Sequence, residues 1–284
     1  MQGKIRYIGK HLACALLLCA ATFSRASAQT TDSAENSAQQ VVVAGARKDP
    51  EKMPYAKFLE AMDYFEKNHT EAPSAMLKFR LVPTHQFDVS SLTVKIKAGD
   101  EVIPLTLDTD LTFAIPRIER LRDKDAYVVV NKNTDNFVWR TYVQTPGLPP
   151  DQRRLGDLRV ECRINFKSGL ERFMGPGGPI VGPLYATKMD DPCYAPTIDY
   201  PTFFTFRPVF NVTISDGSKQ LTLKTKYLWR SGSQDVVVAL PFVTNFIRTY
   251  SYAPPVRDGS WSNDSMLSFE FMDDASHDNA AINR

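Results

Sequence analysis

The sequence predicts a mainly β protein, an antiparallel β-sandwich with one N-terminal amphipathic helix, and three observations lead to this fold class. Short segments alternate apolar and polar residues with the two-residue period of a strand that has one face in water. Turn-forming glycines, prolines and aspartates separate these segments at close intervals. Only one segment has the apolar period of a helix. The length allows one or two sandwiches, in an immunoglobulin-like or prealbumin-like style.

The helix is expected between Met53 and His69, where charged residues separate apolar ones at helical spacing. Pro54 suits a first helical turn, in which an amide hydrogen is not needed, and Pro73 prevents further continuation. The apolar stripe, which should pack on a sheet, consists of Tyr55, Phe58, Leu59, Met62 and Phe65.

Strand-like alternation fills the first half of the chain after the helix. Turns at residues 99–100 and 108–110 separate the segments, and the proline-rich segment 146–150 then breaks the chain. The last two strands are expected to pair as a hairpin around the polar loop 131–136. The expected strands of this half cover residues 92–97, 103–107, 111–115, 127–130 and 137–143.

The second half repeats this pattern. Strict alternation of apolar and polar residues over 157–166 predicts a strand, and Asp216 with Gly217 marks the turn of a hairpin. Residues 175–183 are expected to form a glycine- and proline-rich loop. The expected strands of this half cover residues 157–166, 210–214, 221–223, 236–240 and 267–271.

The beginning of the chain has the form of a secretory signal. Basic residues precede the apolar run 12–21, and Ala26 and Ala28 supply the small residues of a cleavage site, so we expect cleavage after Ala28. Ser24 and Arg25 interrupt the apolar run well before the roughly 20 residues that a membrane helix needs. A retained anchor is therefore the weaker alternative, and no transmembrane segment is expected after cleavage. Lipidation of Cys19 is also the weaker alternative, because the bulky Leu18 precedes the cysteine where lipoprotein signals have a small residue.

These patterns divide the chain into five parts. Residues 29–50 are polar and should form a disordered arm, and the tail beyond residue 272 should be disordered as well. The expected parts are a signal peptide at 1–28, the arm at 29–50, a helix with a first β-sheet region at 51–146, a second β-rich region with a disulfide at 147–272, and the tail at 273–284.

Removal of the signal changes the charge of the protein. Four basic residues and no acidic residue lie in 1–28, so the net charge falls from +2 to −2. Without a basic surface, nucleic-acid binding is not expected. Only two cysteines remain, Cys162 and Cys193, and in an oxidising compartment they should form a disulfide. The alternative is a pair of metal-binding thiols, but zinc sites need further ligands and none is clustered nearby.

Residues that carry catalysis are not arranged in a recognisable motif. His69, His85 and His277 lie far apart and lack the spacing of a helical metal site, so no metal or other cofactor is expected. A Gly-x-Ser-x-Gly nucleophile motif is absent. Three pairs of acidic residues fit the turn preference of aspartate better than a calcium loop, and these are Asp108 with Asp110, Asp190 with Asp191, and Asp273 with Asp274.

An aromatic and proline-rich segment follows Cys193 and is the most suggestive candidate for a binding surface. Aromatic rings give a large contact area for little lost entropy. The alternative is that these rings cap the core, since aromatic residues are more often buried than displayed. The candidate ligand- or partner-binding residues are Tyr194, Tyr200, Phe203, Phe204, Trp229 and Trp261.

These features favour a non-catalytic protein, periplasmic or secreted, that binds another protein or an envelope component. Residues 41–45 could act by strand addition to the sheet edge of a partner. The alternative is a protein that binds envelope glycan, or a hydrolase of glycan or polymer in which folding assembles carboxylates such as Glu161, Asp191 and Asp199.

Overall fold

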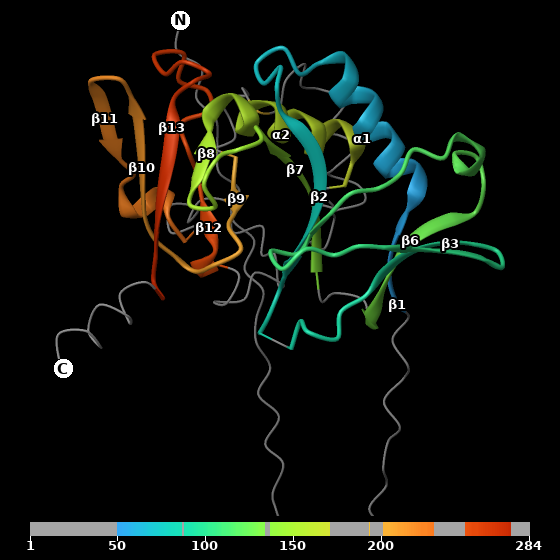
Figure 1. Cartoon of the computed structure of the whole chain (residues 1–284). Helices are drawn as coiled ribbons and strands as arrows, with labels where there is room; N and C mark the ends of the chain where they lie inside the picture. The colour runs from blue at the N-terminus through green and yellow to red at the C-terminus, as the bar shows by residue number, and fades with distance from the viewer. Residues whose placement is uncertain are drawn as a thin grey trace, which may run out of the picture. The chain divides into compact units, whose positions relative to one another are not determined.

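The computed structural model describes residues 50–86, 88–133, 137–170, 193, 201–229 and 248–273, which belong to one compact unit, Arg47–Arg284. The described part is mainly β, with antiparallel sheets and two α-helices (Figure 1). The mainly β, antiparallel prediction is therefore confirmed. Neither α-helix of the described part is long and apolar enough to cross a membrane. The predictions for residues 1–49, 175–183, 236–240 and 274–284 lie outside the described residues.

The first sheet has the order β1-β6-β3-β4. The predicted turn at Gly99 and Asp100 joins the two last strands, with Gly99 at a φ of +58° that glycine adopts without strain. The edge strand β4 carries Pro104, which offers no amide hydrogen to a further strand. The strands are β1 (Pro50–Pro54), β6 (Ala126–Asn133), β3 (Val94–Ala98) and β4 (Glu101–Leu105).

A second sheet has the order β5-β2-β7, with β5 (Thr112–Phe113), β2 (Met76–Pro83) and β7 (Phe137–Gln144). The long strands β2 and β7 pair along their whole length, from Met76 opposite Gln144 to Pro83 opposite Phe137. The predicted hairpin of residues 127–130 with 137–143 is therefore wrong, because β6 and β7 belong to different sheets. The connecting segment lacks a two-residue turn signal, so no local feature forces these neighbours in sequence to pair.

The remaining strands form a four-stranded sheet, β11-β10-β13-β8, and a two-stranded sheet, β12-β9. The predicted hairpin around Gly217 is confirmed as β10 paired with β11, in the register Asp216 opposite Lys219. The strand predicted at 267–271 is confirmed within β13. The strands are β8 (Gln152–Arg154), β9 (Phe203–Phe204), β10 (Val209–Asp216), β11 (Lys219–Thr222), β12 (Ser251–Tyr252) and β13 (Met266–Phe271).

Helix α1 (Tyr55–Lys67) lies within the interval predicted to be helical, and its apolar stripe packs on the second sheet. The ring of Phe58 contacts the rings of Phe79 and Trp139 edge to face, with centroids 4.8 and 5.7 Å apart. The indole of Trp139 donates a hydrogen bond to Glu51 Oε1 at 2.7 Å, which satisfies both buried groups.

Helix α2 (Leu155–Ser168) corrects the prediction of a strand at residues 157–166. Polar residues alternate there because two separate faces of the helix are polar. Asp157, Glu161 and Asn165, which are four residues apart, share one of these faces. Gly169, at a φ of +64°, ends the helix in the left-handed conformation that glycine favours at this position.

Two apolar cores meet at α2, which contacts α1, β7 and β8 (Figure 1). Val160 and Ile164 belong to the core beneath α1, whereas Leu155, Leu158 and Cys162 belong to the core of the β8–β13 region. The start of the helix approaches its surroundings closely, since a Cβ atom on Gly156 would lie 2.3 Å from the carbonyl oxygen of Glu71. A side chain at this position would push the helix away from the turn that contains Glu71, between α1 and β2.

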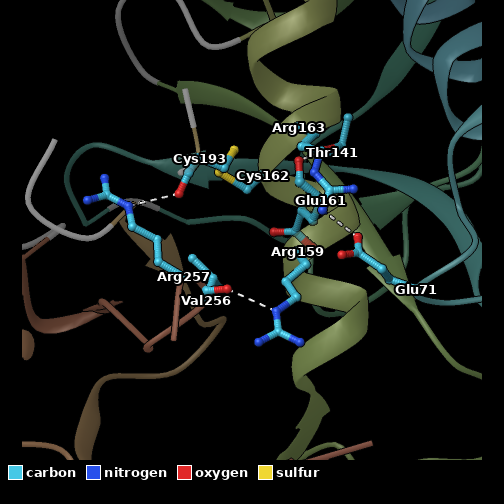
Figure 2. Close-up of a disulfide and its surroundings, with 9 residues drawn as sticks. All are labelled: Glu71, Thr141, Arg159, Glu161, Cys162, Arg163, Cys193, Val256 and Arg257. Atoms are coloured by element: carbon cyan, nitrogen blue, oxygen red, sulfur yellow. Dashed lines mark hydrogen bonds and ion pairs between the residues drawn. A yellow bond between two sulfur atoms is a disulfide. The ribbon is translucent and has the colours of Figure 1, made fainter. Parts of the chain in front are cut away.

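The predicted disulfide joins Cys162 and Cys193, whose Cα atoms are 6.0 Å apart (Figure 2). Cys162 was expected on a strand and lies on α2 instead. Both cysteines are buried, and Arg257 Nε donates a hydrogen bond to the carbonyl oxygen of Cys193 at 2.9 Å. The disulfide therefore ties residue 193 to the helix that the two cores share.

Replacement of both cysteines by alanine should lower the free energy of unfolding by about 3.7 kcal/mol, because the cross-link restricts the unfolded chain. The two cysteines are 31 residues apart in the sequence, which sets the length of the closed loop. Urea denaturation of the variant, the oxidised wild type and the reduced wild type measures this difference, and the reduced protein should match the variant. Equal midpoints for the variant and the oxidised protein would show that the disulfide does not stabilise the fold.

Candidate binding cleft

A row of hydrogen bonds fixes α2 to the outer edge of β7. Four helical residues rise about 6 Å and two strand residues about 6.6 Å, so alternate amides of a strand can meet side chains one helical turn apart. The helix therefore takes the place of a further strand at this edge. The backbone amides of Thr141, Val143 and Thr145 donate to Asn165 Oδ1, Glu161 Oε2 and Asp157 Oδ2, at 2.9, 3.0 and 2.7 Å respectively.

Arg153 on β8 joins this row of hydrogen bonds from the other region of the fold. Its Nη2 donates to Glu161 Oε2 and to the carbonyl oxygen of Val143, both at 2.7 Å. Both charged side chains are buried. Burial opposes the charged form of Arg153, but the Glu161 carboxylate outweighs it and raises the pKa of the guanidinium above its ordinary value.

Tyr142 lies between two guanidinium groups. The guanidinium carbon of Arg80 is 3.8 Å from the centroid of the ring, and that of Arg153 is 4.3 Å away. Such stacking contributes about 0.5–2 kcal/mol for each cation, with the larger values at desolvated sites. The ring thereby holds Arg80 in place relative to α2 and β8.

Arg80 is 4% exposed and binds two groups from distant parts of the chain. Its Nη2 donates to Asp110 Oδ2 at 2.8 Å, and its Nη1 donates to the carbonyl oxygen of Phe204 at 3.3 Å. Burial alone would raise the pKa of the Asp110 carboxyl. The charge of Arg80 and the hydrogen bonds from Thr112 outweigh burial and keep this pKa below its ordinary value. The ion pair is therefore intact at neutral pH.

The turn that carries Asp110 has an unusual backbone. Leu111 has a φ of +62°, a region that branched, bulky residues rarely adopt. Two backbone hydrogen bonds hold the turn. The Leu111 amide donates to the Asp108 carbonyl oxygen at 2.9 Å, and the Asp108 amide donates to the Thr112 carbonyl oxygen at 2.8 Å. The Leu81 amide donates to the Leu111 oxygen at 3.1 Å, which attaches the turn to β2.

A cleft of about 230 Å³ lies where this turn meets the β9–β12 region. Asp110 contributes a partly exposed carboxylate, whereas most other lining side chains are apolar or aromatic. Val89 and Phe206 are 41% and 37% exposed and are among the most exposed large apolar residues of the described part. The described residues that line the cleft are Arg80, Leu81, Val82, Pro83, His85, Gln86, Val89, Thr109, Asp110, Leu111, Thr205, Phe206 and Tyr250.

Of the aromatic residues singled out in the sequence, those that the structure describes lie mostly in the interior. Phe203, Phe204 and Trp261 are 3%, 7% and 2% exposed, so their rings pack in the protein. Trp229 is partly buried, and its indole donates to the Val209 carbonyl oxygen at 2.8 Å. Tyr194 and Tyr200, together with the cleavage-site residues Ala26 and Ala28, lie outside the described residues.

Of the other histidines and carboxylates singled out in the sequence, the described residues His69, His85 and Glu161 lie in different parts of the structure. Glu161 accepts hydrogen bonds from the backbone of β7 and from Arg153. Asp191, Asp199 and His277 lie outside the described residues. His69 contacts the Phe65 carbonyl oxygen through its Nδ1 at 2.7 Å. His85 lines the cleft. Among the described residues, no group of three or more histidines, cysteines and acids could hold a metal ion.

Sequence reasoning did not find the cleft. It identified the turn at residues 108–110 only as a turn, and nothing local indicates that Asp110 pairs with Arg80 or that Phe206 and Tyr250 lie beside them. A hydrophobic residue between an acidic turn and a strand, as at Leu111, was the one available signal. No protein-family model, curated protein or solved structure matches this chain.

Asn165→Leu should lower the free energy of unfolding by about 1–3 kcal/mol, because the buried Thr141 amide loses its acceptor. The amide of Thr141 should also exchange its hydrogen faster than in the wild type. Hydrogen exchange and urea denaturation measure these effects, and Lys167→Ala on the exposed side of α2 is the control, with a change within about 0.5 kcal/mol. Unchanged protection of Thr141 would mean that the hydrogen bond to Asn165 is dispensable.

Asp110→Asn should destabilise the protein by about 3 kcal/mol at pH 7, because it leaves the buried charge of Arg80 uncompensated. The folded pKa of Asp110 is lowered, so its contribution is present above the unfolded pKa of about 3.9 and disappears as the pH falls through the lower folded value. The difference from the wild type should therefore shrink at pH 3.

Denaturation at both pH values tests this prediction, with Asp108→Asn as the matched control. Asp108 pairs with Lys78 at an exposed site, where an ion pair contributes about 1 kcal/mol or less. Equal losses for the two variants at pH 7, or a pH-independent loss for Asp110→Asn, would contradict the role assigned to Arg80.

Proposed function

We propose that this is an exported, non-catalytic protein, periplasmic or secreted, that binds another protein of the cell envelope, and that the cleft beside Asp110 is its binding site. The observation that carries the proposal is the cleft itself. It combines apolar and aromatic walls with polar groups that can orient a ligand, and it lies where two regions of the fold meet.

The exposed apolar rim favours a macromolecular partner. Val89 and Phe206 expose more than a third of their surface at the edge of the cleft. Exposed apolar residues gathered around a concave site are typical of interaction surfaces, whereas single scattered ones are common on any protein. Burial of both residues against a partner would stabilise a complex.

The charges in the cleft favour binding over catalysis. Arg80 and Asp110 neutralise each other, and the pKa of Asp110 is lowered, which is the opposite of what a general acid needs. The disulfide also fits a chain that folds in an oxidising compartment. Tyr194 and Tyr200, which lie outside the described residues, stay proposed partner-binding residues on the evidence of the sequence alone.

A crosslinking pull-down from the native cell envelope tests the proposal. Wild type and Phe210→Ala should recover the same partner, whereas Phe206→Ala should recover at least about tenfold less, as expected for loss of a large aromatic contact worth about 1.4 kcal/mol or more. Phe210 is the matched control because it is an aromatic residue, 59% exposed, that does not line the cleft.

Circular dichroism should show that both variants are folded. A second comparison, with Tyr194 and Tyr200 changed to alanine, tests in the same way whether these two residues contribute to partner binding. Equal recovery by Phe206→Ala and Phe210→Ala would place the interface elsewhere and overturn the assignment of the cleft.

A further inference from the structure

We infer that the cleft accepts a neutral aromatic group that carries a hydrogen-bond donor, namely a tyrosine or tryptophan side chain of the partner. This inference rests on the proposed function and specifies the chemistry of the same site. Three properties of the cleft lead to it: its size, its charge and the kind of polar group that it presents.

The size matches one aromatic side chain. An apolar cavity of roughly 150 Å³ holds a benzene molecule. The cleft, at about 230 Å³, has room for a ring with a substituent or for two fused rings. The walls supplied by Val82, Leu111 and Phe206 offer such a ring apolar contacts.

Of the ion pair in the cleft, the accessible member is the acceptor, and it lies among the exposed polar residues His85, Gln86 and Thr109. The Arg80 side chain is 5% exposed, whereas that of Asp110 is 28% exposed, so a bound group can reach the carboxylate more easily than the guanidinium. Asp110 Oδ1 accepts hydrogen bonds from the amide and hydroxyl of Thr112, at 3.1 and 2.7 Å. In the described part of the chain Oδ2 accepts one hydrogen bond, from Arg80, and a carboxylate oxygen can accept two.

Charge restricts the ligand further. A carboxylate or phosphate would meet the exposed negative charge of Asp110, while the positive charge of Arg80 is buried behind it. An ammonium group would lose its hydration among apolar walls, and the charge of Asp110 is already compensated by Arg80. A phenol or an indole satisfies the acceptor with an O–H or N–H and requires no charge to be buried. Tyrosine and tryptophan are also the residues that dominate the centres of protein interfaces.

The test uses four small probes: p-cresol and indole, which carry a donor, toluene, which has none, and 4-methylbenzoate, which is an anion. Each is titrated into the protein without its signal segment, and the amide shifts of residues 108–112 are followed by NMR. p-Cresol and indole should bind about fivefold to tenfold more tightly than toluene, since one hydrogen bond contributes about that factor. 4-Methylbenzoate should bind more weakly than toluene.

Two variants assign these effects to residues. Phe206→Ala should weaken the binding of p-cresol and of toluene by similar factors, and Phe210→Ala should change the affinity for neither probe. Asp110→Ala should remove the preference for p-cresol over toluene, with toluene binding as evidence that the cleft is still formed. If Asp110→Ala does not fold, the affinities of the wild type for the four probes decide the inference.

The outcomes separate the inference from the proposed function. Equal binding of p-cresol and toluene, or tighter binding of 4-methylbenzoate, overturns the inference. If partner recovery nevertheless depends on Phe206, the proposed function stands with a different ligand chemistry. If the probes show the expected order while partner recovery is the same for Phe206→Ala and Phe210→Ala, the cleft binds donor-bearing rings but is not the interface.

Discussion

The backbone amides at the outer edge of β7 set the constraint on which the rest of the fold depends. In the order β5-β2-β7 this strand lies at an edge, and its amides face the protein interior, where an unsatisfied donor costs about 1–3 kcal/mol. Three side chains of α2 satisfy these amides at one-turn intervals. The helix must therefore lie along β7 in a single register, and a shift by one residue would remove all three acceptors at once.

Fixing α2 also fixes the cleft. Glu161 on this helix binds Arg153, Arg153 stacks on Tyr142, and Tyr142 stacks on Arg80, which pairs with Asp110. Each step is a direct contact in which a buried charge is paired or lies over an aromatic ring. The apolar residues of α2 belong to two cores, and the disulfide adds residue 193 to the same helix. The polar chain of contacts thus links both regions to the cleft.

Local sequence signals predicted the parts of the fold that local physics determines. The helix at α1 and the turns at Gly99 and Gly217 depend on residues within a few positions of each other, and these were predicted correctly. The alternation at residues 157–166 misled because its polar residues serve long-range contacts within the protein rather than solvent. One polar face of α2 accepts hydrogen bonds from residues 141–145, and the arginines of the other face, Arg159 and Arg163, bind Val256 and Glu71 among others. The partner of β7 and the pairing of Arg80 with Asp110 and Phe204 depend on contacts between distant segments, which spacing along the chain does not reveal.

The same contacts are the reason why we propose recognition, and not acid catalysis, for the described cleft. A carboxylate that acts as a general acid needs a raised pKa, which requires burial without a compensating cation. In this cleft the cation is present, held against Tyr142 and behind the carboxylate, so the pKa of Asp110 falls. An ionised carboxylate with a compensated charge is a stable acceptor of fixed position. It can orient a neutral donor in the cleft, and its lowered pKa opposes the uptake of the proton that a general acid must carry.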